Sequence, residues 1–534
     1  MEHLMNMKKP NGLDAWGVTP RALWIIAKVA PQFIQDVYAK LCCSPAEWKT
    51  FSFYGYAKAK KPGAVPAEKV RVINQLPVVV RVVDAELAGM LNGLTEWAEQ
   101  GLNAGFYEAA RKKRQVLDVI FASRLATERG LDAKSQVSIG QADLHKYYDS
   151  LCPIRVARYC ESLVVGGPIA AEQIGCSQVD VSVTLICMHC LPRIVLRVGQ
   201  EEAIMAGKGL GMLTGSASAA ASGRIPPMEL ALSRMGSWQA SGLGLTISPD
   251  HPPLCLMTFV DNFLVLGPSA EANSILLADA ERHLKQTWGL KYGSGSTETM
   301  PCVGSKAPQP ADKGKWPVRT HFRSLGCILQ NNGRCNLDIA DAFGKAHACV
   351  LVNLGKGLLK AGRSAKRRFL VQSVRSTLSW KWGAWTHLKA TSASLDCLQR
   401  CLIALMWQIR PLEGEGMVDF FSRQRRDTGL IADELGWWSE DWARSVVGWH
   451  NHTIRNKAGA WGLPISRWKN QSWVEAQRKS FADRFASLSQ WGITRTSSRA
   501  VRGSPPTRWK DGCKTAADIV VPFGYEGLLE DEAV

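Results

Sequence analysis

Two apolar runs near the middle of the chain are separated by only two polar residues. Residues 254–260 and 263–266 are almost wholly apolar, and Asp261 and Asn262 stand between them. Asp and Asn favour tight turns, so the pattern predicts a β-hairpin with Asp261 and Asn262 at its tip. Short apolar strands would hold the Asp261 carboxylate rigidly at the edge of a buried sheet. The alternative is an ordinary hairpin with a solvated turn.

A second segment, residues 137–144, reads as a strand, and residues 145–151 have helix-entry character. Asp143 would then lie at the end of a strand. Two carboxylates on adjacent strands can hold two Mg²⁺ ions about 4 Å apart, which activate a 3′-hydroxyl and stabilise the leaving pyrophosphate. Asp143 and Asp261 together therefore indicate a nucleotidyltransferase that uses Mg²⁺, with Mn²⁺ as a substitute.

The remaining pattern divides the chain into three parts. Residues 1–45 mix helical pattern with turns, and from residue 48 to 140 apolar strands alternate with amphipathic helices. From 137 to 329, strands are interleaved with helices, which is typical of an α+β fold. Beyond residue 331 the pattern is mostly helical, and this part holds thirteen of the twenty tryptophans, so its composition differs from the rest.

Charge points to a polyanionic partner. Lys and Arg outnumber Asp and Glu by 65 to 47, which gives a net charge of +18. Cations placed near phosphates release counterions, so a basic surplus suits nucleic acid. The alternative is that the chain is basic for reasons unrelated to binding, as many nuclear or ribosome-associated proteins are.

The chain has no sign of export or membrane insertion. Its first ten residues lack the apolar core of a signal peptide. No stretch reaches the roughly 18 apolar residues of a membrane helix. The fifteen cysteines are odd in number and follow no disulfide spacing. We expect a soluble intracellular protein of the nucleus or cytoplasm that is not secreted.

The residues around Asp143 and Asp261 resemble two motifs of the reverse transcriptases of non-LTR (LINE-type) retrotransposons. The first motif has Asp, three residues and a segment ending in Phe/Tyr-Asp, and it stands here as residues 143–149. The resemblance implies that Asp143 binds metal and that Tyr148 lies under the sugar, where it excludes a 2′-hydroxyl. The alternative for Tyr148 is a core aromatic.

The second motif is the aromatic-X-Asp-Asp box, which is similar to residues 259–262. The resemblance implies that Asp261 is the second metal ligand. Asn262 departs from the box. Its amide oxygen can still bind a cation, but one negative charge is missing, so metal affinity should fall. The second Asp is the less essential of the two in this family.

Two further segments resemble nucleotide-binding parts of the family. Residues 211–216 resemble the glycine-containing helix entry, in which Gly215 would let the backbone approach the incoming nucleotide. The alternative for this segment is a close-packed helix of small residues. Residues 69–77 resemble the fingers segment, where Arg71, with Lys60 or Lys61, would neutralise the triphosphate.

Other matches follow in the family's order. Residues 322–327 resemble the primer-grip hairpin, with Leu325 and Gly326 turning against the primer backbone, and residues 502–511 resemble the family's C-terminal ending. The resemblance spans about residues 50 to 515. No endonuclease domain fits before residue 50, which predicts a truncated chain or a separately encoded endonuclease.

The resemblance implies a right-hand RNA-directed DNA polymerase of α+β class, which would act on an RNA template, a DNA primer and dNTPs. Its expected parts are an N-terminal segment (1–45), fingers (46–136), a palm with an antiparallel sheet and the primer grip (137–330), a helical thumb (331–420) and a Trp/Arg-rich C-terminal extension (421–534). One alternative is a weakened or inactive polymerase-like scaffold that binds RNA, because Asn262 and Thr214 depart from the motifs. Another is an RNA-dependent RNA polymerase, against which Tyr148 argues.

Two further clusters in the chain are candidates for binding nucleic acid and zinc. Arg367, Arg368, Arg425 and Arg426 lie among the C-terminal tryptophans, and both side-chain types can stack on unpaired bases. The alternative is that the tryptophans form a core and the arginines a solvated face. Residues 187–190 have zinc-like spacing, but no second Cys/His pair follows, and the apolar run before them, 181–186, reads as a strand.

Overall fold

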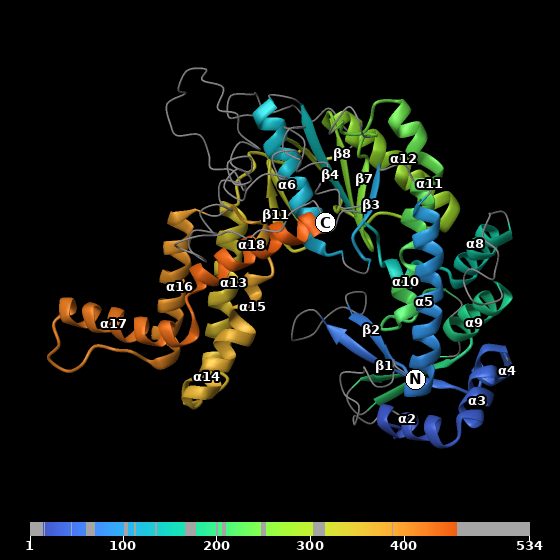
Figure 1. Ribbon diagram of the computed structural model, residues 1–534, viewed down its shortest axis with the longest axis horizontal. Coiled ribbons are helices and arrows are strands. Elements are labelled where there is room, and N and C mark those ends of the chain that lie inside the picture. Colours follow the sequence, from blue (N-terminus) through green and yellow to red (C-terminus); the bar gives the residue numbers. More distant parts are fainter. Residues whose placement is uncertain are drawn as a thin grey trace.

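The computed structural model describes residues 14, 17–43, 45–59, 70–100, 105–111, 114–133, 136–165, 178–198, 201–205, 210–246, 252–302, 316–386 and 388–455. Within these ranges the chain is a mixed α/β structure with two sheets, a separate β-hairpin and a helical lobe (Figure 1). None of the described helices is long and apolar enough to cross a membrane.

A five-stranded sheet carries both predicted carboxylates. In spatial order its strands are β3 (Phe106–Glu108), β7 (Leu256–Phe259), β8 (Asn262–Gly267), β4 (Val137–Asp143) and β9 (Glu298–Cys302). All neighbours are antiparallel except β3 and β7. The predicted hairpin is confirmed as β7–β8, and the predicted strand over 137–144 is confirmed as β4.

Both faces of this sheet are buried. Ile139 of β4 points into the core that contains α6 (Val116–Ala133). Ala142, on the opposite face of the same strand, belongs to the core that contains α12 (Ala270–Trp288). Because neither face meets water, the central strands β7 and β8 are nearly continuous apolar runs instead of an alternation of apolar and polar residues.

A four-stranded sheet forms the second unit. In spatial order its strands are β2 (Val70–Gln75), β1 (Ser52–Ala59), β5 (Arg193–Val198) and β6 (Glu201–Met205), and only β1 and β5 are parallel. The helices in this part of the chain and between the two sheets are α2 (Pro20–Val29), α3 (Pro31–Cys43), α4 (Pro45–Trp48), α5 (Val78–Gln100), α7 (Tyr147–Ser150), α8 (Pro153–Val165), α9 (Gln178–Cys190), α10 (Ala217–Ser222) and α11 (Ile225–Ala240).

The two sheets exchange segments across the boundaries expected from the sequence. β5 and β6 lie inside the range expected for the palm, yet β5 pairs with β1. β3 lies inside the range expected for the fingers, yet it pairs with β7. Strand pairing therefore crosses the boundary expected at residue 136, because it depends on matching edges and apolar faces and does not follow order along the chain.

The prediction of a strand over the apolar run 181–186 is wrong, because these residues belong to helix α9. Much of α9 is buried, with Val181, Leu185 and Met188 all in the core. A helix with little exposed surface has no polar stripe, so its periodicity does not distinguish it from a buried strand.

The last described part is a hairpin followed by a helical lobe. The elements are β10 (His321–Ser324), β11 (Cys327–Gln330), α13 (Asn336–Leu354), η3 (Leu358–Lys360), α14 (Arg363–Phe369), η4 (Leu370–Val374), α15 (Ser376–Ser379), η5 (Trp382–Ala384), α16 (Lys389–Trp407), α17 (Met417–Leu435) and α18 (Trp438–Arg455). Helix α17 packs against α16, and α18 packs against α16 as well. The lobe therefore continues past residue 420, where a thumb–extension boundary was expected.

Tryptophans form the core of this lobe. Trp382, Trp385, Trp438 and Trp442 are all almost fully buried. The indole Nε1 of Trp442 donates a hydrogen bond to the Trp382 carbonyl at 3.0 Å. These four rings therefore pack inside the protein and are not available to stack on bases, which supports the core alternative for them.

Candidate functional site

The turn between β7 and β8 consists of Val260 and Asp261, because Phe259 pairs with Asn262 across the hairpin. The tip predicted from the sequence, Asp261–Asn262, is therefore wrong by one residue, and Asn262 is the first residue of β8. Val260 has a φ of 58°, a left-handed conformation that costs a β-branched residue about 1–3 kcal/mol. Its side chain packs against the core on the α12 side of the sheet, which stabilises the turn.

Asp143 lies beside this turn. It is the last residue of β4 and pairs with Asn262 of β8. The amide of Leu144 donates to the Asp261 carbonyl at 2.9 Å. Paired residues of antiparallel strands have Cα atoms about 4.5–5.5 Å apart, so Asp143 and Asp261 leave the sheet at the same edge. Both line one cavity of about 980 Å³.

The backbone of Asp143 is held from the opposite side by the segment that follows α12. The Gly293 amide donates to the Asp143 carbonyl at 2.8 Å, and the Asp143 amide donates to Ser296 Oγ at 3.2 Å. Two residues further on, the His145 amide donates to the Lys291 carbonyl at 2.9 Å. The end of β4 is therefore fixed on both sides, and little rearrangement is needed to present the carboxylate.

A polar cluster forms another wall of the cavity. Glu298 of β9 accepts a hydrogen bond from Gln141 Nε2 at 3.1 Å and another from Arg319 Nε at 3.3 Å. All three residues line the same cavity as Asp143. Sequence reasoning missed them, because Glu298 reaches the site only through the pairing of β9 with β4, for which the sequence has no local signal.

The β10–β11 hairpin closes the cavity opposite the carboxylates. Its turn residues, Leu325 and Gly326, both have positive φ, at 49° and 84°, which matches the type I′ turns favoured in two-residue hairpins. Leu325 lines the cavity. A Cβ at Gly326 would stand 3.3 Å from the Trp380 ring, so a glycine fits both the φ and the space. The predicted hairpin is present, while its contact with a primer stays a prediction.

Asn262 joins this hairpin to the carboxylate turn. The hydroxyl of Ser324, buried at the end of β10, donates to Asn262 Oδ1 at 3.3 Å. Asn262 Oδ1, the oxygen expected to bind a cation, therefore already accepts one hydrogen bond. A carboxylate at this position could accept the same bond and would add a negative charge.

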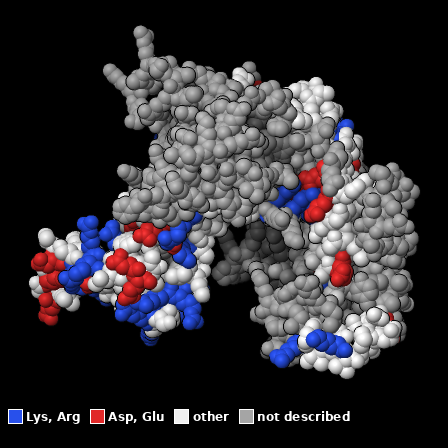
Figure 2. Space-filling model, in the orientation of Figure 1, with Lys and Arg blue, Asp and Glu red and all other residues white. Residues whose placement is uncertain are grey.

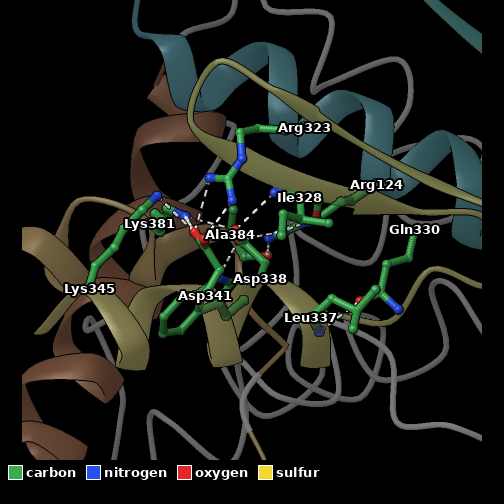
Figure 3. A network of polar contacts seen from close by, with 11 residues as sticks. Arg124, Arg323, Ile328, Gln330, Leu337, Asp338, Asp341, Lys345, Lys381 and Ala384 are labelled. Atoms are coloured by element: carbon green, nitrogen blue, oxygen red, sulfur yellow. Dashed lines mark hydrogen bonds and ion pairs between the residues drawn. The ribbon is translucent and has the colours of Figure 1, made fainter. Parts of the chain in front are cut away.

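A buried ionic network anchors the hairpin from behind (Figure 3). Asp338 of α13 accepts from Arg124 of α6 at 2.7 Å, from Lys381 at 2.8 Å and from the Ile328 amide of β11 at 2.9 Å. Burial alone would raise the pKa of Asp338, but the charges of Arg124 and Lys381 outweigh it and hold that pKa below its usual value. The network connects the central sheet, the hairpin and the helical lobe.

Tyr148 lies near the carboxylates but outside the lining of their cavity. Burial, and then the charge of Asp261, raise the pKa of its hydroxyl to about 12. A Cβ at Gly223 would stand 3.2 Å from a ring carbon of Tyr148, so the glycine makes room for the ring. The neighbouring Tyr147 is fully buried and donates to the Gly223 carbonyl at 2.6 Å. Tyr148 is half-buried between these features, and its predicted contact with a sugar stays a prediction.

Gly215 is exposed but is not among the residues that line the carboxylate cavity. With φ at 108°, its Cα faces the strand β2, and a Cβ there would stand 2.8 Å from the Asn74 carbonyl oxygen. The Asn74 amide in turn donates to the Thr214 carbonyl at 2.8 Å. The structure therefore explains this glycine by the approach of β2 to the loop before α10, and its predicted contact with a nucleotide stays a prediction.

The histidine of the zinc-like segment makes structural contacts. His189 Nδ1 accepts from the Leu213 amide at 3.1 Å, and its Nε2 lies 3.0 Å from Ser218 Oγ. Ser218 in turn donates to Asp84 at 2.6 Å. These bonds hold the loop before α10, and both ring nitrogens of His189 are already in use.

Several predicted residues lie outside what the structure describes. Lys60 and Lys61 fall in such a range, as do residues 502–511. The backbone of Arg71 pairs with Lys58 in the four-stranded sheet, but its side chain lies outside the described part. The expected triphosphate contacts of Arg71 and Lys61 therefore remain predictions.

The four predicted nucleic-acid-binding arginines occupy α14 and α17, where Lys and Arg gather at the end of the lobe (Figure 2). Arg367 is paired with Glu434, and Arg426 is paired with Asp427 at 3.3 Å. Arg368 lies at the surface of α14, and Arg425 lines a cavity between α16 and α17. The structure thus separates two arginines that are neutralised by carboxylates from two that no described carboxylate pairs with.

The carboxylate site can be tested for its fit to a divalent cation. Asp143, Asp261 and the Asn262 amide present hard oxygen donors at one edge of the sheet. In the described ranges there is no group of three or more His, Cys, Asp or Glu placed to hold a metal. Mg²⁺ nevertheless retains waters and substrate phosphate oxygens, so one or two carboxylates suffice. The donors fit Mg²⁺ or Mn²⁺ and do not fit a soft metal that prefers sulfur.

Comparisons with known proteins give only distant likenesses. No family model and no curated protein matches the chain. Among solved structures, it is similar to apo telomerase from Candida tropicalis truncated from its C-terminal domain, with 12% identity and a TM-score of 0.34, over 52% of this chain and 53% of that one. It is also similar to telomerase from Candida albicans in complex with the TWJ fragment of telomeric RNA, with 10% identity and a TM-score of 0.39, over 85% and 71%.

The chain thus spans about half the length of the first telomerase that it matches. At such low TM-scores the likeness assigns neither fold nor function. The function of the chain is therefore inferred from the residues of the site itself.

Proposed function

We propose that this chain is an RNA-directed DNA polymerase of the non-LTR reverse transcriptase type. One observation carries the proposal: Asp143 and the Asp261 turn meet on adjacent antiparallel strands and line one cavity. A polymerase palm needs two carboxylates at neighbouring strand ends, held rigidly where a nucleotide and a primer end can meet. The central sheet would be that palm, the four-stranded sheet the fingers and the helical lobe the thumb.

Asp143 and Asp261 would hold the divalent cation, with Asn262 as a neutral third donor. When bound, Mg²⁺ would lower the pKa of the primer 3′-hydroxyl and stabilise charge on the leaving pyrophosphate. The chain's own contribution is position. Hydrogen bonds from Leu144 and Gly293 fix the strand end and the turn before any substrate arrives, so the reacting groups need less reorganisation.

The β10–β11 hairpin would support the primer across the cavity. Leu325 lines the cavity on that side, and Ser324 bonds the hairpin to Asn262. A shift of the hairpin would therefore move the primer end relative to Asp261. Tyr148 would exclude the 2′-hydroxyl of a ribonucleotide, which favours dNTPs.

The test is primer extension on an RNA template, with dNTPs or NTPs, in Mg²⁺ or Mn²⁺. We expect extension with dNTPs that disappears in Asp261→Ala and survives in Asp419→Ala, which removes an exposed carboxylate of α17 far from the cavity. Several kcal/mol of transition-state stabilisation correspond to a loss of at least about 1,000-fold in rate.

A second candidate is a polymerase-like scaffold that binds RNA without copying it, and Asn262 is the observation that favours it. With one carboxylate fewer at the turn, the site would bind cations weakly. RNA binding without extension in either metal would select the scaffold and reject the polymerase. Extension with NTPs in preference to dNTPs would instead indicate an RNA-dependent RNA polymerase.

A further inference from the structure

The helical lobe contains a second cavity, between α16 and α17, apart from the carboxylate site. Its volume is about 820 Å³. Apolar and polar side chains line it together with three arginines, Arg400, Arg410 and Arg425. No carboxylate is among the described residues that line it. A cavity with this charge suits an anionic ligand.

Most other arginines of the lobe are neutralised by neighbouring carboxylates. Arg423 pairs with Glu415 at 2.7 Å, and Arg444 pairs with Asp441 at 2.8 Å. By contrast, the three arginines of the cavity form no direct ion pair with a described residue, although Arg400 interacts electrostatically with Asp396 of the same helix. Arg410 and Arg425 are exposed, so their positive charge is available to an anionic ligand in the cavity.

The same cavity exposes an apolar wall. The side chains of Phe421 and Leu405 are 56% and 40% exposed. Both line the cavity, together with Gln408 and Gln424, whose side-chain amides can hydrogen-bond a ligand. Arg400 is held over the Trp437 ring, 5.9 Å from its centroid. The ligand that fits is therefore an anion with a flat apolar part.

We infer that this cavity binds an unpaired nucleotide of a single-stranded nucleic acid. The base would lie against Phe421, since every base has a π-face that stacks on an aromatic ring. The flanking phosphates would lie at Arg410 and Arg425, at the mouth of the cavity. An acidic peptide would satisfy the arginines but leave the apolar wall exposed. The inference does not rest on polymerase activity, because it concerns binding by a separate part of the molecule.

Two cysteines of α16 make the site testable directly. Cys397 and Cys401 both line the cavity, and both are exposed. Burial of the sulfur raises the pKa of the Cys401 thiol, so Cys397 is the better probe. An occupant should shield Cys397 from alkylation by N-ethylmaleimide, which peptide mass spectrometry measures residue by residue.

We expect short oligouridylate or oligothymidylate to slow alkylation of Cys397 about tenfold when its concentration is ten times Kd. Protection by only one of them would identify the site as specific for RNA or for DNA. In the double variant Arg410→Gln/Arg425→Gln, a higher oligonucleotide concentration should be needed for half-maximal protection. The slope of log Kd against log salt concentration should be smaller by roughly 1.4, the sum for two phosphate contacts on a single strand.

Two further variants separate the stack from the charge. Phe421→Ala should weaken protection roughly tenfold without changing the salt slope, because it removes a stacking face and no charge. Arg444→Gln is the matched control: it removes an arginine that is 51% exposed on the same lobe but lies outside the cavity. In this variant the oligonucleotide should protect Cys397 as strongly as it does in the unsubstituted chain.

Three results would overturn the inference. The first is an unchanged alkylation rate under conditions where fluorescence anisotropy shows the oligonucleotide bound. The second is equal protection by polyglutamate, which would mean a general polyanion surface. The third is a loss of protection in Arg444→Gln as large as in the double variant. None of these measurements requires nucleotide incorporation, so failure of the proposed polymerase function would leave the result interpretable.

Discussion

At the scale of single residues, Asn262 is the position where the site departs from a pair of carboxylates. Its Oδ1 accepts from Ser324 at 3.3 Å, and an aspartate could keep that bond. Asn262→Asp should therefore retain the hairpin contact and add a charge beside Asp143. We expect the Mg²⁺ concentration for half-maximal primer extension to fall at least about tenfold, because an added charge near a cation is worth several kcal/mol at short range.

The matched control is Asn353→Asp in α13, which adds the same charge far from the cavity. It should leave the Mg²⁺ dependence unchanged. If Asn262→Asp leaves that dependence unchanged too, Asn262 does not face the cation.

The ring of Tyr148 is proposed to lie under the sugar of the incoming nucleotide. If its ring excludes the 2′-hydroxyl by size, Tyr148→Val should reduce the preference for dNTPs over NTPs by roughly 10- to 100-fold, the range that pocket sterics supply. Tyr148→Phe keeps the ring and should keep the preference. Competitive incorporation of the two nucleotide types on one template measures both. An unchanged preference in Tyr148→Val would place the ring in a purely structural role beside Gly223.

Asp261 could be found from the sequence because it follows an apolar run, and Asp143 because it ends a segment that reads as a strand. Both signals are local. Glu298 and Arg319 could not be found in this way. They enter the cavity because β9 pairs with β4 and because the segment at Val318 continues beside Thr299. Such neighbours are set by long-range pairing, which no local pattern encodes.

At the scale of elements, the loop before α10 depends on the contact between Gly215 and Asn74. Gly215→Ala combines a φ of 108° with a Cβ only 2.8 Å from a backbone oxygen. We expect it to lower the free energy of unfolding by about 2 kcal/mol or more. Gly236→Ala, in the interior of α11 with no atom near its Cβ, should instead raise it by about 0.5–1 kcal/mol. Urea unfolding of both variants measures the contrast.

If the two alanine variants behave alike, the contact at Gly215 is not formed in solution. A loss of stability in Gly215→Ala alone would support the structural account of this glycine. It would leave the nucleotide contact to be tested by the KM for dNTPs in the folded fraction.

Hairpins were the most predictable elements, because polar breaks in apolar runs mark them. The turn residues were less predictable. The sequence favoured Asp261–Asn262, yet the pairing of Phe259 with Asn262 puts Val260 in the turn instead. Tertiary packing of Val260 outweighs its poor propensity for positive φ. The same dominance of burial over local pattern hid the helix α9 within an apolar run.

At the scale of the whole molecule, Asp338 joins parts that are far apart in the sequence. Its partners come from α6, β11 and the segment after α15. Its side chain and that of Lys381 are almost fully buried, at 0% and 1% exposure. Asp338→Asn would leave Arg124 with an uncompensated buried charge and Lys381 with only Asp341, 3.7 Å away. We expect a loss of about 3–5 kcal/mol in the free energy of unfolding.

Asp341→Asn is the comparison variant. Asp341 pairs with the half-exposed Arg323 and Lys345 and lies 3.7 Å from Lys381, which would keep its bond to Asp338, so its loss should cost less than the loss of Asp338. Tryptophan fluorescence can follow both variants in urea, because Trp385 Nε1 donates to Asp338 at 2.8 Å. Equal losses in the two variants would mean that the buried network does not hold the parts together.

The pH dependence of the free energy of unfolding of Asp338→Asn tests whether the charge of Asp338 stabilises the fold. The pKa of Asp338 is held below its usual value by Arg124 and Lys381 against the opposing effect of burial. A carboxyl whose pKa is lower in the folded state stabilises the fold above its unfolded pKa and loses that contribution as pH falls through the folded pKa. The difference in free energy of unfolding between the unsubstituted chain and Asp338→Asn should therefore be constant between about pH 5 and 7 and shrink below about pH 4. A difference that stays constant or grows on acidification would show that hydrogen bonding alone, and not the charge of Asp338, joins the sheet to the helical lobe.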